Sequence, residues 1–503
     1  MKTAFINAKV WIKKKHFAQA FVIEKEKFLK IGTNEEILKE KFDHLIDLNN
    51  QVVIPGLIDT HIHFYFAAKY ERYLDLSKAK SHKEVIDLIK KYLQKNKIEK
   101  DDLLIGYDWF EDQFIEKSMF RREELDKHFP DVSIFLWRRS YHSGLANTNT
   151  LKRLNIFYQN ATYEDSFIEL DDAGWPTGYL QEKIIYKTDS LISNASIEKE
   201  KKLLVKWAKK ANQLGITGIY TCDLRNENWY RDFLIYEQLN NQNLLNLEIY
   251  HQLWMTDQHY RNQFLNSYSA LKIKKNNHNL KAIKLFADGG LNRKILHLKD
   301  FDTPVFLEEN SLAKLIVEIN QKKLATVVHA SSHIAGKIVA KAIIKADKEN
   351  KFRNGIIHGT IIDDELLDLL SKYPINVSLQ PCFLQMYPKE SQLPLLRLRD
   401  LNKNKVKASL GTDWKVCDLN PWKNIYSALS HFHKKQRITL DQALKMYTIN
   451  SAQYLGQEKK MGKIAANYYA NFLVLNQDIF AIKTKQIKKT KSTQTWFRGK
   501  RVV

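Results

Sequence analysis

Residues 52–64 read VVIPGLIDTHIHF, and this stretch decides the fold. An apolar run leads into a Pro-Gly turn, and a second short run then places His61 and His63 two residues apart. Because side chains alternate across a strand, this spacing puts both imidazoles on one face. Two such imidazoles can chelate one metal ion, and Asp59 can orient one of them. The stretch therefore predicts a metal site at the end of a strand.

Seven further apolar runs follow, and amphipathic helical patterns separate them. They are GITGIYT (215–221), NLEIYHQLW (246–254), KAIKLFADGG (281–290), LATVVHA (324–330), GIIHG (355–359), NVSLQP (376–381) and KASLGTDW (407–414). Continuous apolar strands covered by helices indicate a parallel sheet. This number of strand–helix units in this length favours an α/β fold of the (β/α)8 TIM-barrel type over an open sheet.

Both ends of the chain are rich in short strand patterns. Neither end has enough strands to fold alone, so we expect residues 1–54 and 465–503 to form one composite, sandwich-like β-domain. The barrel is expected to span residues 55–464. Residues 65–200 interrupt the alternation of strands and helices, which predicts an insertion after the first barrel strand, over the mouth of the barrel. Within it, GYDWFEDQF (106–114) is expected to be a loop.

The composition indicates an ordered globular protein of 503 residues, with 44% hydrophobic and 27% charged residues. Lys and Arg outnumber Asp and Glu by 80 to 57, for a net charge of +23. The lysines are dispersed, however, and do not alternate with aromatic residues as in a nucleic-acid-binding module. We expect a small-molecule substrate, no nucleic-acid partner and no membrane segment, and a homodimer stays open.

The cysteines are few and odd in number: Cys222, Cys382 and Cys417. Without a CxxC pair they argue against a disulfide framework and against a cysteine zinc cage. A reducing, cytoplasmic location fits this pattern. Cys382 is expected to be a small buried hydrophobic residue, and a place in the lining of the pocket is the alternative.

Four of the later strands end in side chains that bind metals: Lys284, His329, His358 and Asp413. Each alone fits a structural role as well, since a histidine closing a strand is usually hydrogen-bonded and an aspartate after Gly-Thr usually caps a helix. The carboxyl ends of barrel strands, however, meet at one rim. We therefore expect these residues to converge with the two histidines of the first strand.

Taken in order, these motifs resemble the amidohydrolase superfamily, specifically its YtcJ-like branch (amidohydrolase family 3), which includes N-substituted formamide deformylases. PGLIDTHIHF, IKLFADGGLNRK, VVHASSHIAGKIV, GIIHGTII and LGTDW match its strand motifs. GYDWFEDQF, SYHSGLANTNTL and GWPTGYLQE resemble blocks of the branch's insertion. The resemblance covers essentially the whole chain and implies a metal-dependent hydrolase acting on carbon–nitrogen bonds other than peptide bonds.

The resemblance also implies the ligands of one or two divalent ions, usually zinc. The first ion would be held by His61, His63 and Asp413, and the second by His329 and His358. Lys284 would bridge the two ions as a carbamate, since a lysine becomes a two-oxygen ligand only after carboxylation by CO₂. If this lysine stays unmodified, a one-metal site remains open, with its ammonium paired to Asp288 or to a substrate carboxylate.

The mechanism follows from this ligand set. A bound ion would lower the pKa of water to about 7, and the resulting hydroxide would attack an amide, formamide or cyclic amide. Asp413 would take the proton of the water and pass it to the leaving amine.

Further residues are singled out by their family position. His142 would steady the oxyanion. Trp109 and Glu182 are further candidates for substrate contact, and packing inside the insertion is the alternative for all three. His333 stands where the branch commonly has an aspartate, and the surface of a helix is its expected place.

Two other functions stay open. One is a one-metal deaminase of a heteroaromatic base, and the other is a non-catalytic, basic binding or regulatory protein on the same scaffold. Deaminases of this superfamily lack the bridging lysine, so Lys284 favours the hydrolase. A scaffold without catalytic function would bind no stoichiometric metal.

Overall fold

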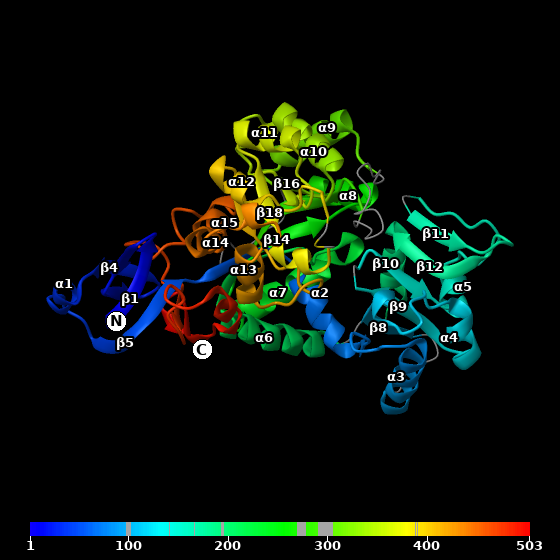
Figure 1. Cartoon of the computed structure of the whole chain (residues 1–503), viewed down its shortest axis with the longest axis horizontal. Coiled ribbons are helices and arrows are strands. Elements are labelled where there is room, and N and C mark those ends of the chain that lie inside the picture. Colours follow the sequence, from blue (N-terminus) through cyan, green and yellow to red (C-terminus); the bar gives the residue numbers. More distant parts are fainter. Residues whose placement is uncertain are drawn as a thin grey trace. The chain divides into compact units, whose positions relative to one another are not determined.

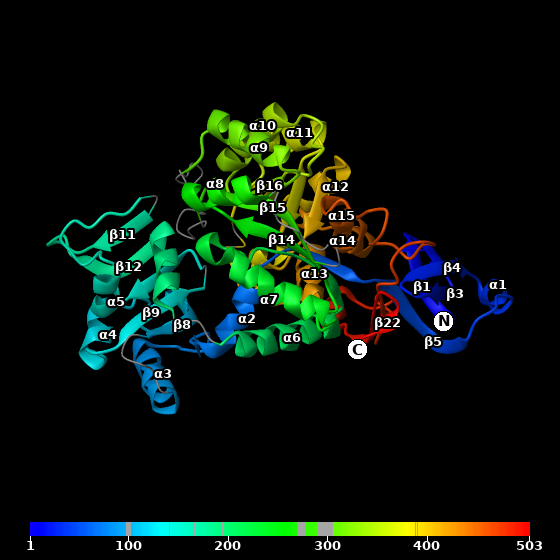
Figure 2. The same ribbon diagram turned by 180° about the vertical axis from the view of Figure 1, so that it is seen from behind.

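The computed structural model describes residues 1–96, 102–139, 141–164, 166–192, 196–268, 278–289, 305–387, 389 and 391–503. The chain divides into two compact units. The first comprises residues 1–65 and 201–503, and the second comprises residues 66–200. Figures 1 and 2 show their strands and helices from opposite sides.

Eight parallel strands form the nearly closed barrel sheet of the first unit, which confirms the predicted fold class. In chain order they are β6 (Leu57–Ile62), β13 (Ile216–Thr221), β14 (Glu248–Trp254), β15 (His278–Phe286), β16 (Ala325–Ala330), β17 (Gly355–His358), β18 (Asn376–Leu379) and β19 (Lys407–Leu410). Every residue of β6, β13, β14 and β16 is buried. Such uninterrupted burial is typical of parallel strands that helices cover on the outside and side chains fill on the inside.

The first and last barrel strands meet through individual hydrogen bonds. The Thr60 hydroxyl donates to the Leu410 carbonyl (3.0 Å), and the Asp413 amide donates to the His61 carbonyl (2.8 Å). Gly411 permits this approach, because a Cβ atom there would lie 2.5 Å from the His61 nitrogen. The junction thus places two predicted metal ligands side by side.

Helices lie around the barrel strands in both views (Figures 1 and 2). They are α6 (Ile197–Gln213), α7 (Trp229–Asn241), α8 (Gln258–Ser267), α9 (Glu309–Gln321), α10 (His333–Ala346), α11 (Asp364–Lys372), α12 (Leu398–Lys403), α13 (Pro421–Leu429), α14 (Leu440–Tyr447) and α15 (Ile449–Tyr454). In α10, Val339 and Ile343 lie four residues apart on one face and share a buried cluster with Val328 of β16. None of the helices in the described part of the chain has both the length and the apolar character that crossing a membrane requires.

Strands from both ends of the chain share one sheet, in the order β22-β21-β20-β5-β1-β3-β4, with β2 paired to β1. They are β1 (Lys2–Lys13), β2 (His16–Ala18), β3 (Ala20–Glu24), β4 (Lys27–Gly32), β5 (His44–Pro55), β20 (Phe472–Leu475), β21 (Ser492–Phe497) and β22 (Lys500–Arg501), with the short helix α1 (Asn34–Leu38). The Phe5 ring lies 4.6 Å from that of Phe21 and 5.4 Å from that of Phe472, centroid to centroid. One aromatic core is therefore built from both termini.

The second unit has a six-stranded sheet of its own, in the order β11-β12-β10-β9-β8-β7. Its strands are β7 (Leu74–Asp75), β8 (Leu103–Trp109), β9 (Ser133–Arg138), β10 (Ser143–Ala146), β11 (Ser166–Leu170) and β12 (Pro176–Glu182), with helices α2 (Phe64–Lys69, at the junction of the units), α3 (His82–Lys95), α4 (Arg122–His128) and α5 (Thr148–Arg153). The expected loop at 106–114 is wrong in its first half, which belongs to β8. This half completes an apolar run that is largely buried and pairs with β9. Burial and backbone hydrogen bonds therefore favour a strand over a loop here.

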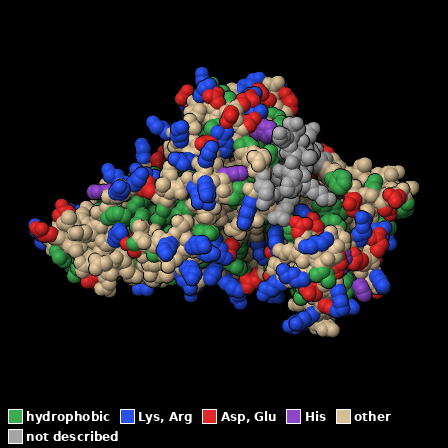
Figure 3. Space-filling model, viewed as in Figure 1, with side chains coloured by type: hydrophobic (Ala, Val, Ile, Leu, Met, Phe, Trp, Pro, Cys, Tyr) green, Lys and Arg blue, Asp and Glu red, His purple; other side chains and the backbone are tan. Residues whose placement is uncertain are grey.

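Two further features correct or qualify the sequence analysis. Cys382 and Cys417 form a disulfide, with Cα atoms 6.3 Å apart, contrary to the expected pattern of unpaired cysteines. Their sequence separation of 35 residues hides this proximity. Lys and Arg side chains, blue in Figure 3, are spread over the visible face among acidic side chains.

Candidate metal centre

Asp413 lies among three imidazoles at the carboxyl ends of the barrel strands. Its Oδ1 atom is 3.5 Å from His61 Nε2 and 3.2 Å from His63 Nε2, and its Oδ2 atom is 4.0 Å from His358 Nδ1. Candidate ligand atoms of His61, His358 and Asp413 all lie within 4.8 Å of one another, and all three residues are buried. A carboxylate with several imidazoles is a donor set that suits zinc.

Neighbouring acceptors set the tautomers of two of these histidines. His63 Nδ1 lies 2.9 Å from the Cys222 carbonyl oxygen, and His358 Nδ1 lies 2.8 Å from Gln380 Oε1. The Gln380 amide nitrogen donates to the Ser378 carbonyl, which turns its oxygen toward the imidazole. Both Nδ1 atoms therefore carry a proton, so Nε2 is the nitrogen of each ring that a metal ion would bind.

His329 on β16 extends the cluster. Its ring centroid is 4.4 Å from that of His358, and its Nε2 atom is 3.5 Å from Asp288 Oδ1. Asp288 also accepts the backbone N–H groups of Ser331 (2.9 Å) and Ser332 (2.7 Å) just before α10. The sequence suggested Asp288 only as a partner for an unmodified Lys284, whereas the structure shows that it binds the segment after His329.

Lys284 on β15 is buried, and among the described residues its Nζ atom has no hydrogen-bond partner. Burial lowers the pKa of this amine from 10.5 to about 8. Only the neutral amine can react with CO₂, so the lowered pKa increases the reactive fraction at neutral pH. A buried amine without a hydrogen-bond partner is costly, and carboxylation would remove this cost by turning it into a metal-binding group.

Charges within the cluster favour metal-binding protonation states. Burial, together with the charges of Lys284 and the neighbouring histidines, holds the pKa of His61 well below its usual value, so this imidazole is neutral. Burial acts to raise the pKa of Asp413, but a hydrogen bond from His63 and the nearby positive charges outweigh it and lower this pKa. Asp413 is therefore an ionised carboxylate, and Lys284 acts electrostatically on both residues.

Two candidate ligands have left-handed backbone conformations. The φ angle is +81° at His358 and +51° at Asp413. This region is uncommon for residues other than glycine, and such strain is concentrated at functional sites. At Asp413 it turns the chain directly after β19, where the side chain reaches the histidines of β6.

Aromatic residues that the sequence analysis did not single out lie beside the histidines. The Trp254 ring at the end of β14 is 5.9 Å from His63 and 4.6 Å from Phe286, and Phe286 stacks on His329 at 5.1 Å. The Arg225 guanidinium lies 4.1 Å above the Trp254 ring. Their position at strand ends was a usable signal, because barrel enzymes place substrate contacts there.

The candidates in the insertion have contacts inside the second unit. His142 Nδ1 lies 3.0 Å from Glu182 Oε2. Trp109 is buried and donates its indole N–H to the Leu136 carbonyl (2.9 Å). In the first unit, His333 is the first residue of α10 and is half-buried.

Comparison with known proteins matches this chain to one family over most of its length. The profile of the Amidohydrolase family matches residues 44–503. The chain is 28% identical over 502 residues to YtcJ of Bacillus subtilis (strain 168), named as an amidohydrolase, and covers 92% of both proteins. It is 23% identical over 518 residues to the N-substituted formamide deformylase of Arthrobacter pascens, covering 96% of this chain and 94% of that protein. The resemblance drawn from the sequence is confirmed.

Solved structures share the fold. The crystal structure of an uncharacterized metal-dependent hydrolase from Pyrococcus horikoshii OT3 aligns with a TM-score of 0.76 and 19% identity, over 96% of this chain and 99% of that chain. A second such hydrolase, from Pyrococcus furiosus, aligns with a TM-score of 0.72 and 21% identity, over 95% of this chain and 99% of that chain.

Proposed function

This chain belongs to the amidohydrolase family, and we propose that it is a metal-dependent hydrolase that cleaves a carbon–nitrogen bond in a small amide, formamide or cyclic amide. The observation that carries this proposal is the position of Asp413, within 4.0 Å of nitrogen atoms of three histidines, two buried and one half-buried, at the ends of barrel strands. Amide hydrolysis needs an activated water and a proton carrier, and this cluster contains groups suited to both.

The donor set fits divalent metal ions. Two histidines donate from Nδ1 to other groups, so their Nε2 atoms are the ones that a metal ion would bind, and a buried lysine nitrogen has no hydrogen-bond partner among the described residues. One ion would be held by His61, His63 and Asp413, and a second by His329 and His358, with carboxylated Lys284 between them. When bound, zinc lowers the pKa of water and polarises the scissile carbonyl.

Asp413 moves the proton in this proposal. Its lowered pKa keeps it ionised at neutral pH, so its carboxylate accepts a proton from the attacking water. The same carboxyl group then donates this proton to the leaving nitrogen as the carbon–nitrogen bond breaks. Trp254 and Phe286 would contact an apolar part of the substrate, because they flank the histidines on one side.

The test combines metal analysis with a substrate panel. We would measure zinc per chain in the purified protein, and hydrolysis of N-formyl, N-acyl and cyclic amide compounds with added Zn²⁺ or Mn²⁺. We expect at least one zinc ion per chain and turnover of at least one amide class.

The matched variants are His63→Asn in the cluster and His16→Asn at an exposed position of β2. Only the former should lose metal and turnover. A chain that binds no stoichiometric metal would contradict the proposal and favour the non-catalytic alternative. Metal-dependent release of ammonia from a heteroaromatic base, without amide hydrolysis, would favour the deaminase.

A further inference from the structure

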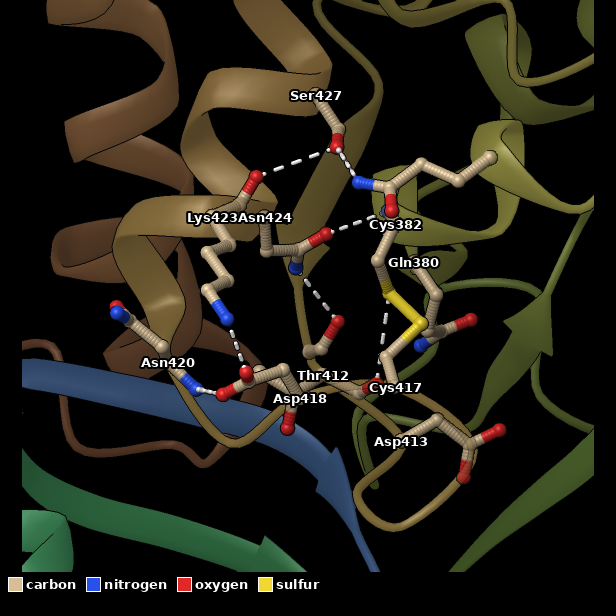
Figure 4. The surroundings of a disulfide bond; sticks show 12 residues. Gln380, Cys382, Thr412, Asp413, Cys417, Asp418, Asn420, Lys423, Asn424 and Ser427 are labelled. Atoms are coloured by element: carbon tan, nitrogen blue, oxygen red, sulfur yellow. Dashed lines mark hydrogen bonds and ion pairs between the residues drawn. A yellow bond between two sulfur atoms is a disulfide. The ribbon is translucent and has the colours of Figure 1, made fainter. Parts of the chain in front are cut away.

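The Cys382–Cys417 disulfide lies beside the metal centre and has no part in the proposed chemistry (Figure 4). Cys382 belongs to the 3-10 helix η7 (Pro381–Gln385), two residues after Gln380, which orients His358. Cys417 lies four residues after Asp413. The bond therefore joins the segment that sets one ligand's tautomer to the loop that carries another ligand.

Hydrogen bonds hold this loop before Asp413. The Gly411 amide donates to the Leu379 carbonyl (3.0 Å). Asn424 on α13 joins the same two segments: its Oδ1 atom accepts the Cys382 amide (2.7 Å; Figure 4), and its Nδ2 atom donates to the Gly411 carbonyl (2.8 Å). The stretch that precedes the ligand is thus attached to the barrel without the disulfide.

After Asp413 the chain is held by packing of the buried Trp414 ring on those of Trp207 (4.4 Å) and Phe64 (5.8 Å), by a backbone hydrogen bond and by the disulfide. The His63 amide donates to the Trp414 carbonyl (2.9 Å), and the Cys417 amide makes a long 3.4 Å contact with the Asp413 carbonyl within the loop itself. The disulfide is the covalent tie of this half of the loop to η7. Asp413 has the strained φ angle of +51°, so holding the chain on both sides of it matters for keeping the carboxylate in place.

We propose that Cys382 and Cys417 form a thiol–disulfide exchange site whose redox state sets the affinity of the neighbouring centre for zinc. The disulfide form holds Asp413 against the histidines, and the dithiol form binds zinc more weakly. This inference rests on the proposed metal centre. The ligand class of the exchange site is a small thiol or dithiol.

An external dithiol supplies the electrons and protons that reduction of the disulfide requires. Its thiolate attacks the Cys417 sulfur, which belongs to a half-buried residue, whereas Cys382 is only 8% exposed. The Cys382–Cys417 bond breaks, and the Cys382 sulfur leaves as a thiolate and takes up a proton. The second thiol of the reagent then displaces Cys417, so two electrons and two protons pass to the protein and the reagent becomes a cyclic disulfide. The Thr412 carbonyl, 3.5 Å from the Cys382 sulfur, can accept the new S–H group.

The experiment compares zinc binding by the full-length, metal-free protein in its two redox states. One sample is oxidised with a small disulfide and the other is reduced with a phosphine, which is then removed without air. Thiol titration after denaturation should give one thiol, Cys222, in the oxidised sample and three in the reduced one. Competition with a chromophoric chelator, with Zn²⁺ as the probe, should show about tenfold weaker binding after reduction, the size of effect typical of groups that support a metal ligand.

Two variants assign the response. The double variant Cys382→Ser, Cys417→Ser should bind zinc as weakly as the reduced protein, and the reductant should not change its affinity. In Cys222→Ala, reduction should still weaken zinc binding. Equal zinc affinity in the two redox states, or failure of the oxidant to form the Cys382–Cys417 bond, would overturn the proposed exchange site without contradicting the metal centre. Absence of zinc binding in both states overturns the metal centre itself, and the exchange site with it.

Discussion

Two groups of histidines lie on or next to the strands of the same barrel, yet their surroundings differ. His251 on β14 and His278 on β15 face each other with Nε2 atoms 2.6 Å apart. Their rings pack against α7, where Phe233 lies 4.6 Å from His278 and Tyr236 lies 4.8 Å from His251. One imidazole donates to the other, so this pair uses its own Nε2 atoms in a hydrogen bond.

The histidines of the metal centre use their Nδ1 atoms for hydrogen bonds instead. His63 and His358 donate from Nδ1 to oxygen acceptors, and a carboxylate, Asp413, lies opposite their rings. Burial lowers the pKa of histidines in both groups, so neutral imidazoles alone do not distinguish them. What distinguishes the candidate metal site from the structural pair is that oxygen acceptors bind Nδ1 of its histidines and that a carboxylate lies beside them.

The largest effect is expected from Asp413→Asn. The amide cannot carry the proton from water to the leaving nitrogen, so kcat should fall about 10³-fold while KM changes little. Steady-state kinetics on any substrate found by the panel would measure this. Asp418→Asn, in the exposed part of the same loop, is the matched control and should leave kcat unchanged. Equal losses in both variants would mean that the loop, and not the carboxylate, is responsible.

The second effect concerns Lys284→Ala. Loss of the bridging group should lower the zinc content from about two ions per chain to about one. Metal analysis measures the loss, and added short carboxylic acids should partly restore the second ion because they can occupy the space that the carbamate leaves. Lys281→Ala, on the same strand and half-buried, is the control. Full metal content and full activity in Lys284→Ala would replace the two-metal proposal with a one-metal enzyme.

Gln380→Leu tests the role of the tautomer. Without the acceptor for Nδ1, His358 loses its preference for the tautomer with the proton on Nδ1, and zinc affinity should fall about 10- to 100-fold. Chelator competition measures the affinity, and the melting temperature of the metal-free protein controls for misfolding. Gln380→Glu keeps the acceptor and should restore most of the affinity, while Gln385→Leu, at an exposed position, should change nothing. An unchanged affinity in Gln380→Leu would show that the hydrogen bond does not orient this ligand.

The smallest effect on the metal centre is expected from His278→Gln, which should leave zinc content unchanged. This histidine should instead affect acid stability, because burial lowers its pKa from 6.5 to about 3. Its stabilising effect is complete above pH 6.5 and is lost as the pH falls from 6.5 toward 3, since only the unfolded chain takes up the proton there.

Between pH 7 and pH 5, wild-type protein should therefore lose about 2 kcal/mol more unfolding free energy than His278→Gln. Urea unfolding of the metal-free proteins at the two pH values measures this difference. Identical pH dependence would contradict the neutral, buried state of this histidine. A fall in zinc content would mean that the pair belongs to the metal centre after all.

The fold class was accessible from the sequence because its signals are local. The apolar runs and amphipathic helices mark the eight barrel strands, and the motifs at their ends identify the family. In the insertion the same approach failed at residues 106–109, where a glycine and two aromatic residues suggested a loop but cross-strand pairing makes a strand. The placement of residues 65–200 over the barrel mouth stays a prediction.

The sequence by itself determined which residue types end each barrel strand, because each of these residues directly follows a recognisable apolar run. Only the tertiary structure decided which histidines face a carboxylate and which face each other, because their partners come from other parts of the chain. Gln380 and the Cys222 carbonyl are far from their histidines in sequence, and Cys382 is 35 residues from Cys417. Contacts of this kind depend on how the sheet closes, and no local pattern encodes them.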